Sequence, residues 1–229
     1  MNMHGDVKRR YQSPLRQAQA RTTRKAVIGA AARLFAERGY VTTSIDDIAA
    51  AAGVSRATVF SSVGGKAVLL KTAFDVAIVG DDEPVALPDR PRSKAIREEP
   101  DQRRYLALYA GLVTEMWVRL GGIYEAVRGA ASADPEARGL WETHQAQRRV
   151  GAANVVGDLQ RKGSLREGLE VEAAADIVWV LNDPGLYHQL VDRQGWAPET
   201  FARWLAEAMQ RLLLADELPT GVSSRPPDA

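Results

Sequence analysis

The chain has no cysteine among its 229 residues, and this absence excludes disulfide bonds, thiolate metal sites and cysteine nucleophiles. It has only three histidines, His4, His144 and His188, and none has the H-E-x-x-H spacing of a zinc site. No apolar run approaches the ~18 residues of a membrane span, and the first 25 residues are polar and basic, unlike a secretory signal. We therefore expect a cytoplasmic protein with no membrane partner, no metal and no cofactor.

Signals of the common enzyme classes are missing as well. The serine, histidine and aspartate residues are not accompanied by a G-x-S-x-G elbow. Residues 64–66 (GGK) lack the spacing of a phosphate-binding loop, and residues 81–83 (DDE) are typical of a solvated charge run in a loop. We predict that the protein is not an enzyme and has no catalytic residues.

The hydrophobic pattern has a helical period along most of the chain. No stretch alternates with period two, as a half-buried strand would, and so we predict an all-α protein. Helices are expected at about 23–38 and at 66–79. Two shorter helices are expected between them, one that begins after a cap at Thr43 or Ser44 and one between Ser55 and the Gly64-Gly65 pair. Beyond a proline-rich, charged segment with a short helical turn at 93–98, further helices are expected at about 103–120, 122–131, 134–162, 171–182, 184–193 and 198–214.

These patterns divide the chain into five parts. The N-terminal region combines a basic flexible arm with a helix-turn-helix domain and its connecting helix, and the C-terminal region is a helical bundle. The predicted bounds are 1–22 for the arm, 23–79 for the helix-turn-helix domain, 80–101 for a linker, 102–215 for the bundle and 216–229 for a disordered tail.

Charge is distributed unevenly between the two regions. Residues 1–75 carry 12 Lys and Arg against 5 Asp and Glu, whereas residues 76–229 carry 18 against 24. The net charge of +1 therefore conceals a basic N-terminal third on an acidic remainder. Such an asymmetry indicates a polyanionic partner for one end of the chain, and chance scatter over solvated faces is the alternative.

The most specific motif lies between residues 43 and 63. Two short helical patterns meet at Gly53, where glycine permits a left-handed turn, and the second pattern is small, rich in hydroxyl groups and led by Arg56. This is the form of a helix-turn-helix whose second helix enters the major groove of DNA. We therefore predict that the protein binds double-stranded DNA.

Residues 23–71 contain a set of short strings at fixed spacing: FAERGY at 35–40, TSI at 43–45, DIA at 47–49, AGVS at 52–55, TVF at 58–60, and Lys66 leading Leu69-Leu70. With these strings, the segment resembles the DNA-binding domain of the TetR family of bacterial transcriptional regulators. The resemblance implies a C-terminal domain that binds an effector and forms a homodimer. Two departures stand out, because Phe60 replaces a usual tyrosine whose hydroxyl meets a DNA phosphate, and Ser62-Val63 replaces a common His-Phe pair.

Candidate DNA contacts follow from the motif. Arg56, at the start of the third helix, is suited to guanine O6 and N7, with a phosphate contact or a solvated side chain as the alternative. Lys66 is expected to meet backbone phosphate, and free N–H groups at a helix start also suit a phosphate. The predicted DNA-binding residues are Thr43, Ser44, Ser55, Arg56, Ala57, Thr58, Phe60, Ser61, Ser62 and Lys66.

The C-terminal helices are expected to provide dimerisation and regulation. Helices 171–182 and 198–214 carry more apolar surface than one neighbouring helix covers, and the resemblance assigns them to a four-helix interface between two copies; packing within one subunit is the alternative. A small-molecule effector is expected among the central helices, and few basic residues among its candidate contacts favour a neutral or cationic ligand. Those candidates, for each of which core packing is the competing role, are Tyr105, Tyr109, Met116, Trp117, Trp141, His144, Trp179 and Asn182, with Asn154, Asp158 and Asp176 as further polar candidates.

The predicted function is therefore a sequence-specific transcriptional regulator, a ligand-released repressor that acts as a homodimer on a palindromic operator. Two alternatives stay open on the sequence alone. One is an effector-independent DNA binder, and the other is a helical ligand-binding or scaffold protein whose DNA module is weakened at Phe60 and Val63.

Overall fold

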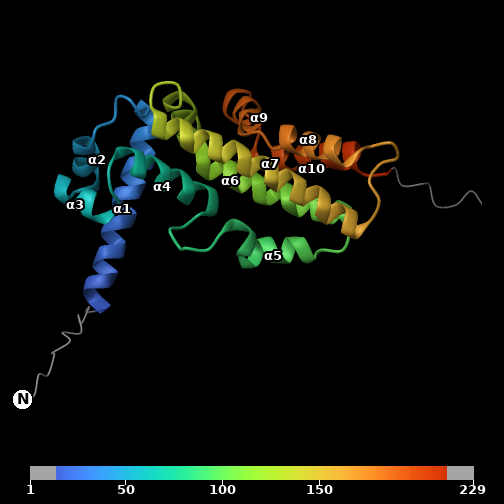
Figure 1. Cartoon of the computed structure of the whole chain (residues 1–229), viewed down its shortest axis with the longest axis horizontal. Coiled ribbons are helices and arrows are strands. Elements are labelled where there is room, and N and C mark those ends of the chain that lie inside the picture. Colours follow the sequence, from blue (N-terminus) through green and yellow to red (C-terminus); the bar gives the residue numbers. More distant parts are fainter. Residues whose placement is uncertain (1–13, 216–229) are drawn as a thin grey trace, which may run out of the picture. The chain divides into compact units, whose positions relative to one another are not determined.

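The computed structural model of the chain describes residues 14–215, and this part is helical without a β-strand (Figure 1). An isolated bridge pairs Leu165 with Leu214. The all-α prediction is thus confirmed for the described part of the chain. The predicted tail at 216–229 and the first 13 residues of the predicted arm lie outside it. Among the described helices, none is both long and apolar enough to cross a membrane.

The N-terminal helices agree with the predicted pattern except at the start of the first one. Helix α1 begins at Pro14, nine residues before the expected start at 23. Residues 14–22 are exposed on every face, and a helix segment without a buried face has no hydrophobic periodicity by which to predict it. The sequence left a disordered and a part-helical arm open, and residues 14–22 are helical. The four helices are α1 (Pro14–Arg38), α2 (Ile45–Ala52), α3 (Arg56–Ser62) and α4 (Lys66–Val79).

The chain divides into two compact units, of which the first contains the chain up to Val76 together with Gly122–Arg138. Its core is built on one face of α1. Val27, Ala31 and Phe35 follow one another at the four-residue spacing of a helix face, and all three have no exposed surface. Helices α2 and α3 both pack against α1, so the helix-turn-helix is held on the buried face of this helix.

Helix α6 (Gln102–Ala130) is interrupted at Gly121, where φ is 42° and ψ is −136°. The predicted division into helices 103–120 and 122–131 is therefore confirmed. In the first unit, a Cβ at position 122 would lie only 3.0 Å from the Cβ of Ala36, so glycine lets α6 approach α1 closely. Tyr40 donates a hydrogen bond of 3.2 Å to Asp134 nearby, and burial together with this carboxylate raises the pKa of Tyr40 to about 12.

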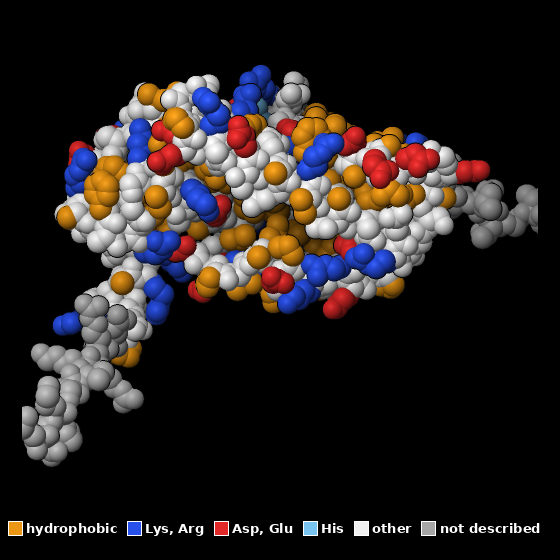
Figure 2. Space-filling model, in the orientation of Figure 1, with side chains coloured by type: hydrophobic (Ala, Val, Ile, Leu, Met, Phe, Trp, Pro, Cys, Tyr) orange, Lys and Arg blue, Asp and Glu red, His pale blue; other side chains and the backbone are white. Residues whose placement is uncertain are grey.

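The second unit contains Ala77–Gly121 and the chain from Gly139 onward. Its centre is formed by the first part of α6 and most of α7 (Pro135–Lys162). The segment predicted as a linker contains two short helices, and Figure 2 shows a hollow with hydrophobic atoms beside one of them, α5. The remaining elements are η1 (Leu87–Asp89), α5 (Pro91–Glu98), α8 (Val171–Leu181), α9 (Pro184–Tyr187), the π-helix η2 (His188–Arg193) and α10 (Pro198–Leu213).

Candidate DNA-binding surface and central hollow

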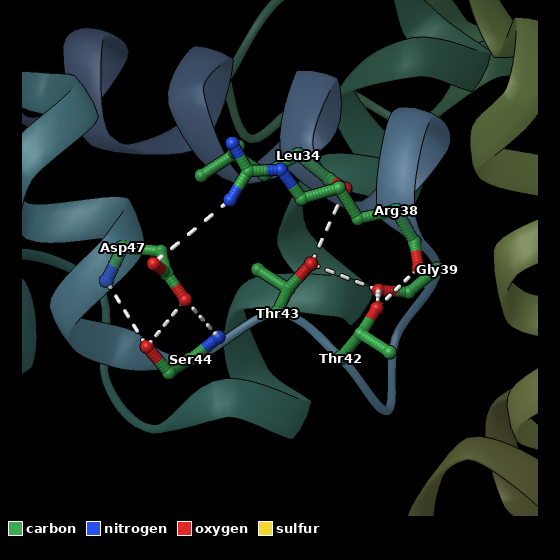
Figure 3. A network of polar contacts seen from close by, with 7 residues as sticks. All are labelled: Leu34, Arg38, Gly39, Thr42, Thr43, Ser44 and Asp47. Carbon is green, nitrogen blue, oxygen red and sulfur yellow. Dashed lines mark hydrogen bonds and ion pairs between the residues drawn. The ribbon is translucent and has the colours of Figure 1, made fainter.

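Helix α2 begins with a reciprocal cap between Ser44 and Asp47 (Figure 3). The Asp47 N–H donates to the Ser44 hydroxyl oxygen at 3.1 Å, and the Ser44 N–H donates to the Asp47 carboxylate at 2.9 Å. This capping box satisfies two N–H groups that the helix itself leaves without a partner. The hydrogen bonds from the Ser44 hydroxyl and N–H lower the pKa of Asp47. Ser44 is exposed, and its prediction as a DNA contact is compatible with this position.

Thr43 differs from Ser44, the cap of α2, because its side chain is buried and binds the end of α1. Its side chain is 1% exposed, and its hydroxyl shares its hydrogen between the carbonyls of Gly39 at 2.8 Å and Leu34 at 3.2 Å (Figure 3). These bonds fasten the start of α2 to the end of α1. The Thr43 hydroxyl is thus turned into the domain, and a phosphate contact at this helix start stays a prediction that rests on backbone N–H groups.

The turn between α2 and α3 is built as the sequence indicates. Gly53 adopts the left-handed conformation, with φ 67° and ψ 32°, which a residue with a Cβ adopts only at a cost. Ser55 then caps α3, because its hydroxyl oxygen accepts the Thr58 N–H at 3.1 Å. Val59 has no exposed surface and anchors α3 to the core. The opposite side of this short helix is left to face outward.

That outward side carries most of the predicted DNA contacts. Arg56, Ala57, Phe60 and Ser61 are exposed, and Thr58 and Ser62 are half-buried. The Ser61 hydroxyl donates to the carbonyl of Thr58 at 3.2 Å, and the Ser62 hydroxyl donates to that of Val59 at 3.1 Å. Both hydroxyl oxygens still have lone pairs for other donors. The arrangement resembles the reading face of a recognition helix.

Arg56 is held by two neighbours on this face. Its Nη1 lies 2.7 Å from Oδ2 of Asp46, and its Cζ lies 5.6 Å from the centre of the Phe60 ring. Asp46 was not among the predicted site residues. Its ten-residue separation from Arg56 crosses the turn between helices, and no periodicity of the sequence marks such a contact.

A second contact missed at the sequence level secures the far end of α3. Nη1 of Arg24 in α1 donates to the carbonyl of Ser62 at 2.6 Å. The last carbonyls of a helix have no partner within the helix, and a guanidinium there also complements the negative end of the helix dipole. Arg24 thus supports α3 where Val63 stands in place of a larger aromatic side chain.

Lys66, at the start of α4, reaches back to the loop that precedes α2. Its ammonium donates to the carbonyl of Val41 at 3.2 Å and lies 4.4 Å from the centre of the Tyr40 ring. Partial burial lowers the pKa of Lys66, and the charge of Asp134 opposes this effect. An ammonium has three N–H donors, so two are left for a phosphate oxygen.

In the second unit, a hollow of about 460 Å³ lies between α5, α6 and α7. Of the eight predicted effector contacts, only Tyr105 and Tyr109 line it, and of the further polar candidates Asn154 and Asp158 do so. Its walls are mainly aliphatic and aromatic, with a few polar groups. The lining residues are Leu87, Pro88, Ser93, Ile96, Arg97, Tyr105, Tyr109, Leu112, Gly151, Ala153, Asn154, Val155, Gly157, Asp158 and Arg161.

The polar groups of the hollow form two small networks. Tyr105 donates to Oδ2 of Asp158 at 2.9 Å, and Arg161 pairs with Oδ1 of the same carboxylate. Asn182 donates through Nδ2 to the hydroxyl oxygen of Tyr109 at 3.0 Å. Burial raises the pKa of both tyrosines, so each hydroxyl keeps its proton at neutral pH and is a donor as well as an acceptor.

The other six predicted effector contacts do not line this hollow, and several belong instead to a buried polar cluster around Arg148. Its Nη2 donates to the carbonyls of Trp179 and Asn182, each at 2.8 Å, and its Nη1 lies 3.1 Å from the Asp183 carboxylate. His144 is 5% exposed, and burial together with the charge of Arg148 lowers its pKa to about 4. The predicted effector contacts away from the hollow are Met116, Trp117, Trp141, His144, Trp179 and Asn182.

No group of three or more His, Asp or Glu side chains within residues 14–215 is placed to hold a metal ion. The sites of interest are therefore the exposed face of α3 and the hollow of the second unit.

Comparison with known proteins agrees with this geometry. A family model for bacterial regulatory proteins of the tetR family matches residues 27–73, which include α2 and α3. The chain is 28% identical over 158 residues to YdeS of Bacillus subtilis (strain 168), an uncharacterised HTH-type transcriptional regulator, and the match spans 69% of this chain and 74% of YdeS.

Two solved structures share the fold over most of their length. One is NalD, the secondary repressor of the MexAB-OprM multidrug efflux pump in Pseudomonas aeruginosa, with a TM-score of 0.62 and 23% identity over 86% of this chain and 98% of NalD. The other is a complex of SmeT with triclosan, with a TM-score of 0.63 and 18% identity over 90% of this chain and 99% of SmeT. The helix-turn-helix domain of the chain thus matches the TetR family of bacterial regulatory proteins, and the described part of the chain shares the fold of these two structures.

Proposed function

We propose that the protein is a repressor that binds a palindromic operator as a homodimer and releases it when a small molecule enters the hollow of the second unit. The observation that carries the DNA-binding part is the arrangement of α3. Val59 fixes one side of the helix in the core, while Arg56, Phe60 and Ser61 are exposed on the other. Side chains in such a position reach base edges in the major groove.

Dimerisation is supported by apolar side chains that the single chain leaves uncovered on α8 and α10. Val171 is 40% exposed and Val180 is 53% exposed on α8, and Leu212 is 37% exposed on α10. Helices α8 and α10 pack against one another, and each of them leaves apolar side chains exposed. A single helix-turn-helix offers a small contact area, and two copies reading two half-sites would supply the affinity and the palindrome.

Release by a ligand is supported by the hollow and by the course of the central helices. Helices α6 and α7 both contribute residues to the two units. A shift of either helix on ligand binding would therefore be passed along the chain to the DNA-binding unit. A ligand shifts the equilibrium only if it binds the DNA-free form more tightly. The related structures of NalD, a repressor, and of SmeT with triclosan favour the same reading.

Selection of bound fragments from the source organism's genomic DNA with the purified protein tests this function. We expect enriched fragments to share an inverted repeat, whose half-sites lie about 34–36 Å apart or a multiple of that distance. Arg56→Ala should relax the preference at one base position in each half-site. Enrichment of no common sequence would overturn the repressor proposal and favour a weakened DNA module. Binding that no ligand of a screening collection ever releases would favour an effector-independent DNA binder.

A further inference from the structure

We propose that the hollow binds a small organic acid, whose apolar body lies against Tyr105 and Tyr109 and whose acidic group meets Arg97 and Arg161 at the rim. The link to DNA release rests on the function proposed above, whereas the binding site itself does not. The inference is drawn from the shape of the hollow, the charges around it and the hydrogen bonds that these charges already make.

The interior of the hollow suits an apolar body. Its volume of about 460 Å³ falls within the roughly 300–1,000 Å³ of small-molecule sites. Leu112 and Val155 supply aliphatic wall. The rings of Tyr105 and Tyr109 are nearly parallel, with 14° between their planes and 6.4 Å between their centres, and together they offer a continuous aromatic surface.

The charged groups of the lining are unequal in number. Two arginines, Arg97 and Arg161, stand against a single carboxylate, Asp158. A third cation, Lys162, lies just outside the lining, where its ammonium is 5.0 Å from the Tyr105 ring centre and donates to the carbonyl of Arg97. In Figure 2, Lys and Arg side chains lie along the edge of the hollow next to α5, with Asp and Glu side chains among them. Within the lining, cationic groups therefore outnumber carboxylates, and this excess favours an anion.

The one carboxylate of the lining already has partners. Asp158 is 7% exposed, one of its oxygens accepts from the Tyr105 hydroxyl at 2.9 Å, and the other is paired with Arg161. A cationic ligand would have to displace Arg161 from this pair. Asp158 thus positions Arg161 at the rim, and it offers little attraction to a second cation.

The arginines, by contrast, retain donors for a ligand. Arg97 donates through Nη2 to the carbonyl of Pro88 at 2.8 Å, and the side chain of Arg161 is 66% exposed. A guanidinium has five N–H donors in a planar fork, so both residues keep several that are suited to a carboxylate. The sequence-level preference for a neutral or cationic ligand is revised, because most of the candidate contacts behind it do not line the hollow.

A matched series of ligands tests the charge preference directly. Octanoate, octylammonium and octan-1-ol share one apolar body and differ only in the head group. We expect isothermal titration of the full-length protein to show octanoate binding at least tenfold more tightly than octylammonium. Arg97→Gln and Arg161→Gln should each weaken octanoate binding about tenfold, or ~1.4 kcal/mol. Arg166→Gln is the matched control, because Arg166 is exposed on the following loop and does not line the hollow.

Asp158→Asn separates a binding role from a purely structural one. The amide removes the negative charge from the wall and releases Arg161, while its oxygen still accepts from Tyr105. Octanoate should then bind more tightly, whereas octylammonium binding should change little because Asp158 attracts a second cation only weakly; damage to the fold would weaken the binding of both. Octylammonium binding as tightly as octanoate, binding of none of the three compounds, or octanoate binding that is unchanged in Arg97→Gln and Arg161→Gln would each overturn the proposal.

The same compounds separate this inference from the repressor function. Octanoate that binds with the expected charge preference and leaves the operator complex intact supports the acid site and contradicts ligand release through it. Release of the operator by a compound whose effect is identical in wild type, Arg97→Gln and Arg161→Gln supports regulation and contradicts the acid site.

Discussion

The guanidinium of Arg56 is bound to the carboxylate of Asp46, with 2.7 Å between Nη1 and Oδ2. The two residues come from the two helices of the helix-turn-helix, and Arg56 also lies over the Phe60 ring at 5.6 Å. A carboxylate competes for the same N–H donors that guanine O6 and N7 would accept. Both side chains are more than half exposed, and an exposed ion pair of this kind contributes at most about 1 kcal/mol, so contact with DNA is able to break it.

Asp46→Asn should therefore strengthen DNA binding. The substitution removes a negative charge from a surface that faces a polyanion, and it frees Arg56. We expect fluorescence anisotropy to show a gain of roughly threefold to fivefold, about 0.6–1 kcal/mol, on the selected operator.

A double-mutant cycle with Arg56→Ala shows whether the pair itself is responsible. In the Arg56→Ala background, Asp46→Asn should give a smaller gain, equal to the effect of charge alone. Glu37→Gln, an exposed carboxylate on α1, provides a control for removal of charge from the same domain. An equal gain from Asp46→Asn in both backgrounds would mean that Asp46 does not act through Arg56.

Phe60→Tyr should raise the affinity for every DNA sequence by a similar factor. The added hydroxyl restores the phosphate donor that the TetR resemblance associates with this position, and the ring stays beneath Arg56. One hydrogen bond to a charged group contributes about 1.5–3 kcal/mol, so the expected gain is roughly tenfold or more. Anisotropy titrations on the operator and on a scrambled duplex measure it, and a gain confined to the operator would indicate a base contact instead.

Lys66→Met should weaken binding on all sequences and reduce the salt dependence. Methionine keeps an apolar chain against Tyr40 but removes the ammonium that lies 4.4 Å from that ring. Loss of one phosphate contact should lower the slope of log K against log salt by about 1. Lys71→Met, which removes an exposed lysine paired with Asp75 within α4, should leave the slope unchanged. Equal slopes for wild type and Lys66→Met would show that Lys66 makes no phosphate contact and only stabilises the loop before α2 through the carbonyl of Val41.

The local geometry of the candidate DNA-binding face was largely predictable because its determinants are local in the sequence. The cap at Ser44, the turn at Gly53 and the cap at Ser55 each act over a few residues, and the structure has all three. Asp46 and Arg24 were missed for the opposite reason. Their contacts with α3 depend on how helices cross, and neither residue has a motif of its own.

The hollow was predicted less well for a similar reason. The aromatic type of a residue on a central helix does not decide whether its side chain lines a cavity or fills a core. Tyr105 lines the hollow and Trp117, on the same helix, is 2% exposed within the core. Tyr105 and Asp158 are 53 residues apart, and only the packing of α6 on α7 brings them together.

His144 should make stability depend on pH between about 6.5 and 4. Burial lowers its pKa to about 4 in the folded chain, against about 6.5 when unfolded. Below pH 6.5 the unfolded chain therefore binds a proton that the folded chain does not, so stability falls as the pH falls, and the loss is complete near pH 4. From about pH 7.5 to pH 5 the expected loss is about 2 kcal/mol.

Urea unfolding of wild type and His144→Gln at both pH values measures this contribution. Glutamine does not titrate, so only wild type should lose this part of its free energy of unfolding. The free energy of unfolding of wild type relative to His144→Gln should therefore be about 2 kcal/mol lower at the lower pH than at the higher pH. A difference that stays the same at both pH values would mean that His144 is protonated, or accessible to protons, in the folded chain.

Arg148→Met should be strongly destabilising because the arginine holds the end of α8 from within the unit. Its side chain is 4% exposed, and it donates to the carbonyls of Trp179 and Asn182, each at 2.8 Å. Methionine leaves these carbonyls and the Asp183 carboxylate without the guanidinium. Removing one partner of a buried ion pair costs about 3–5 kcal/mol, and because Asp183 is 39% exposed we expect about 2–4 kcal/mol.

Arg149→Met is the matched control, since the neighbouring arginine has the same length and the same kind of partner. Its ion pair with Asp176 measures 2.8 Å, but both side chains are at least 59% exposed, and the expected loss is about 1 kcal/mol or less. Arg148→Lys should recover only part of the stability, because one ammonium does not reproduce the planar fork that reaches two carbonyls and a carboxylate together. Urea unfolding at neutral pH compares the three variants. Equal losses for Arg148→Met and Arg149→Met would show that burial of Arg148 adds nothing, and that α8 is held by its apolar contacts alone.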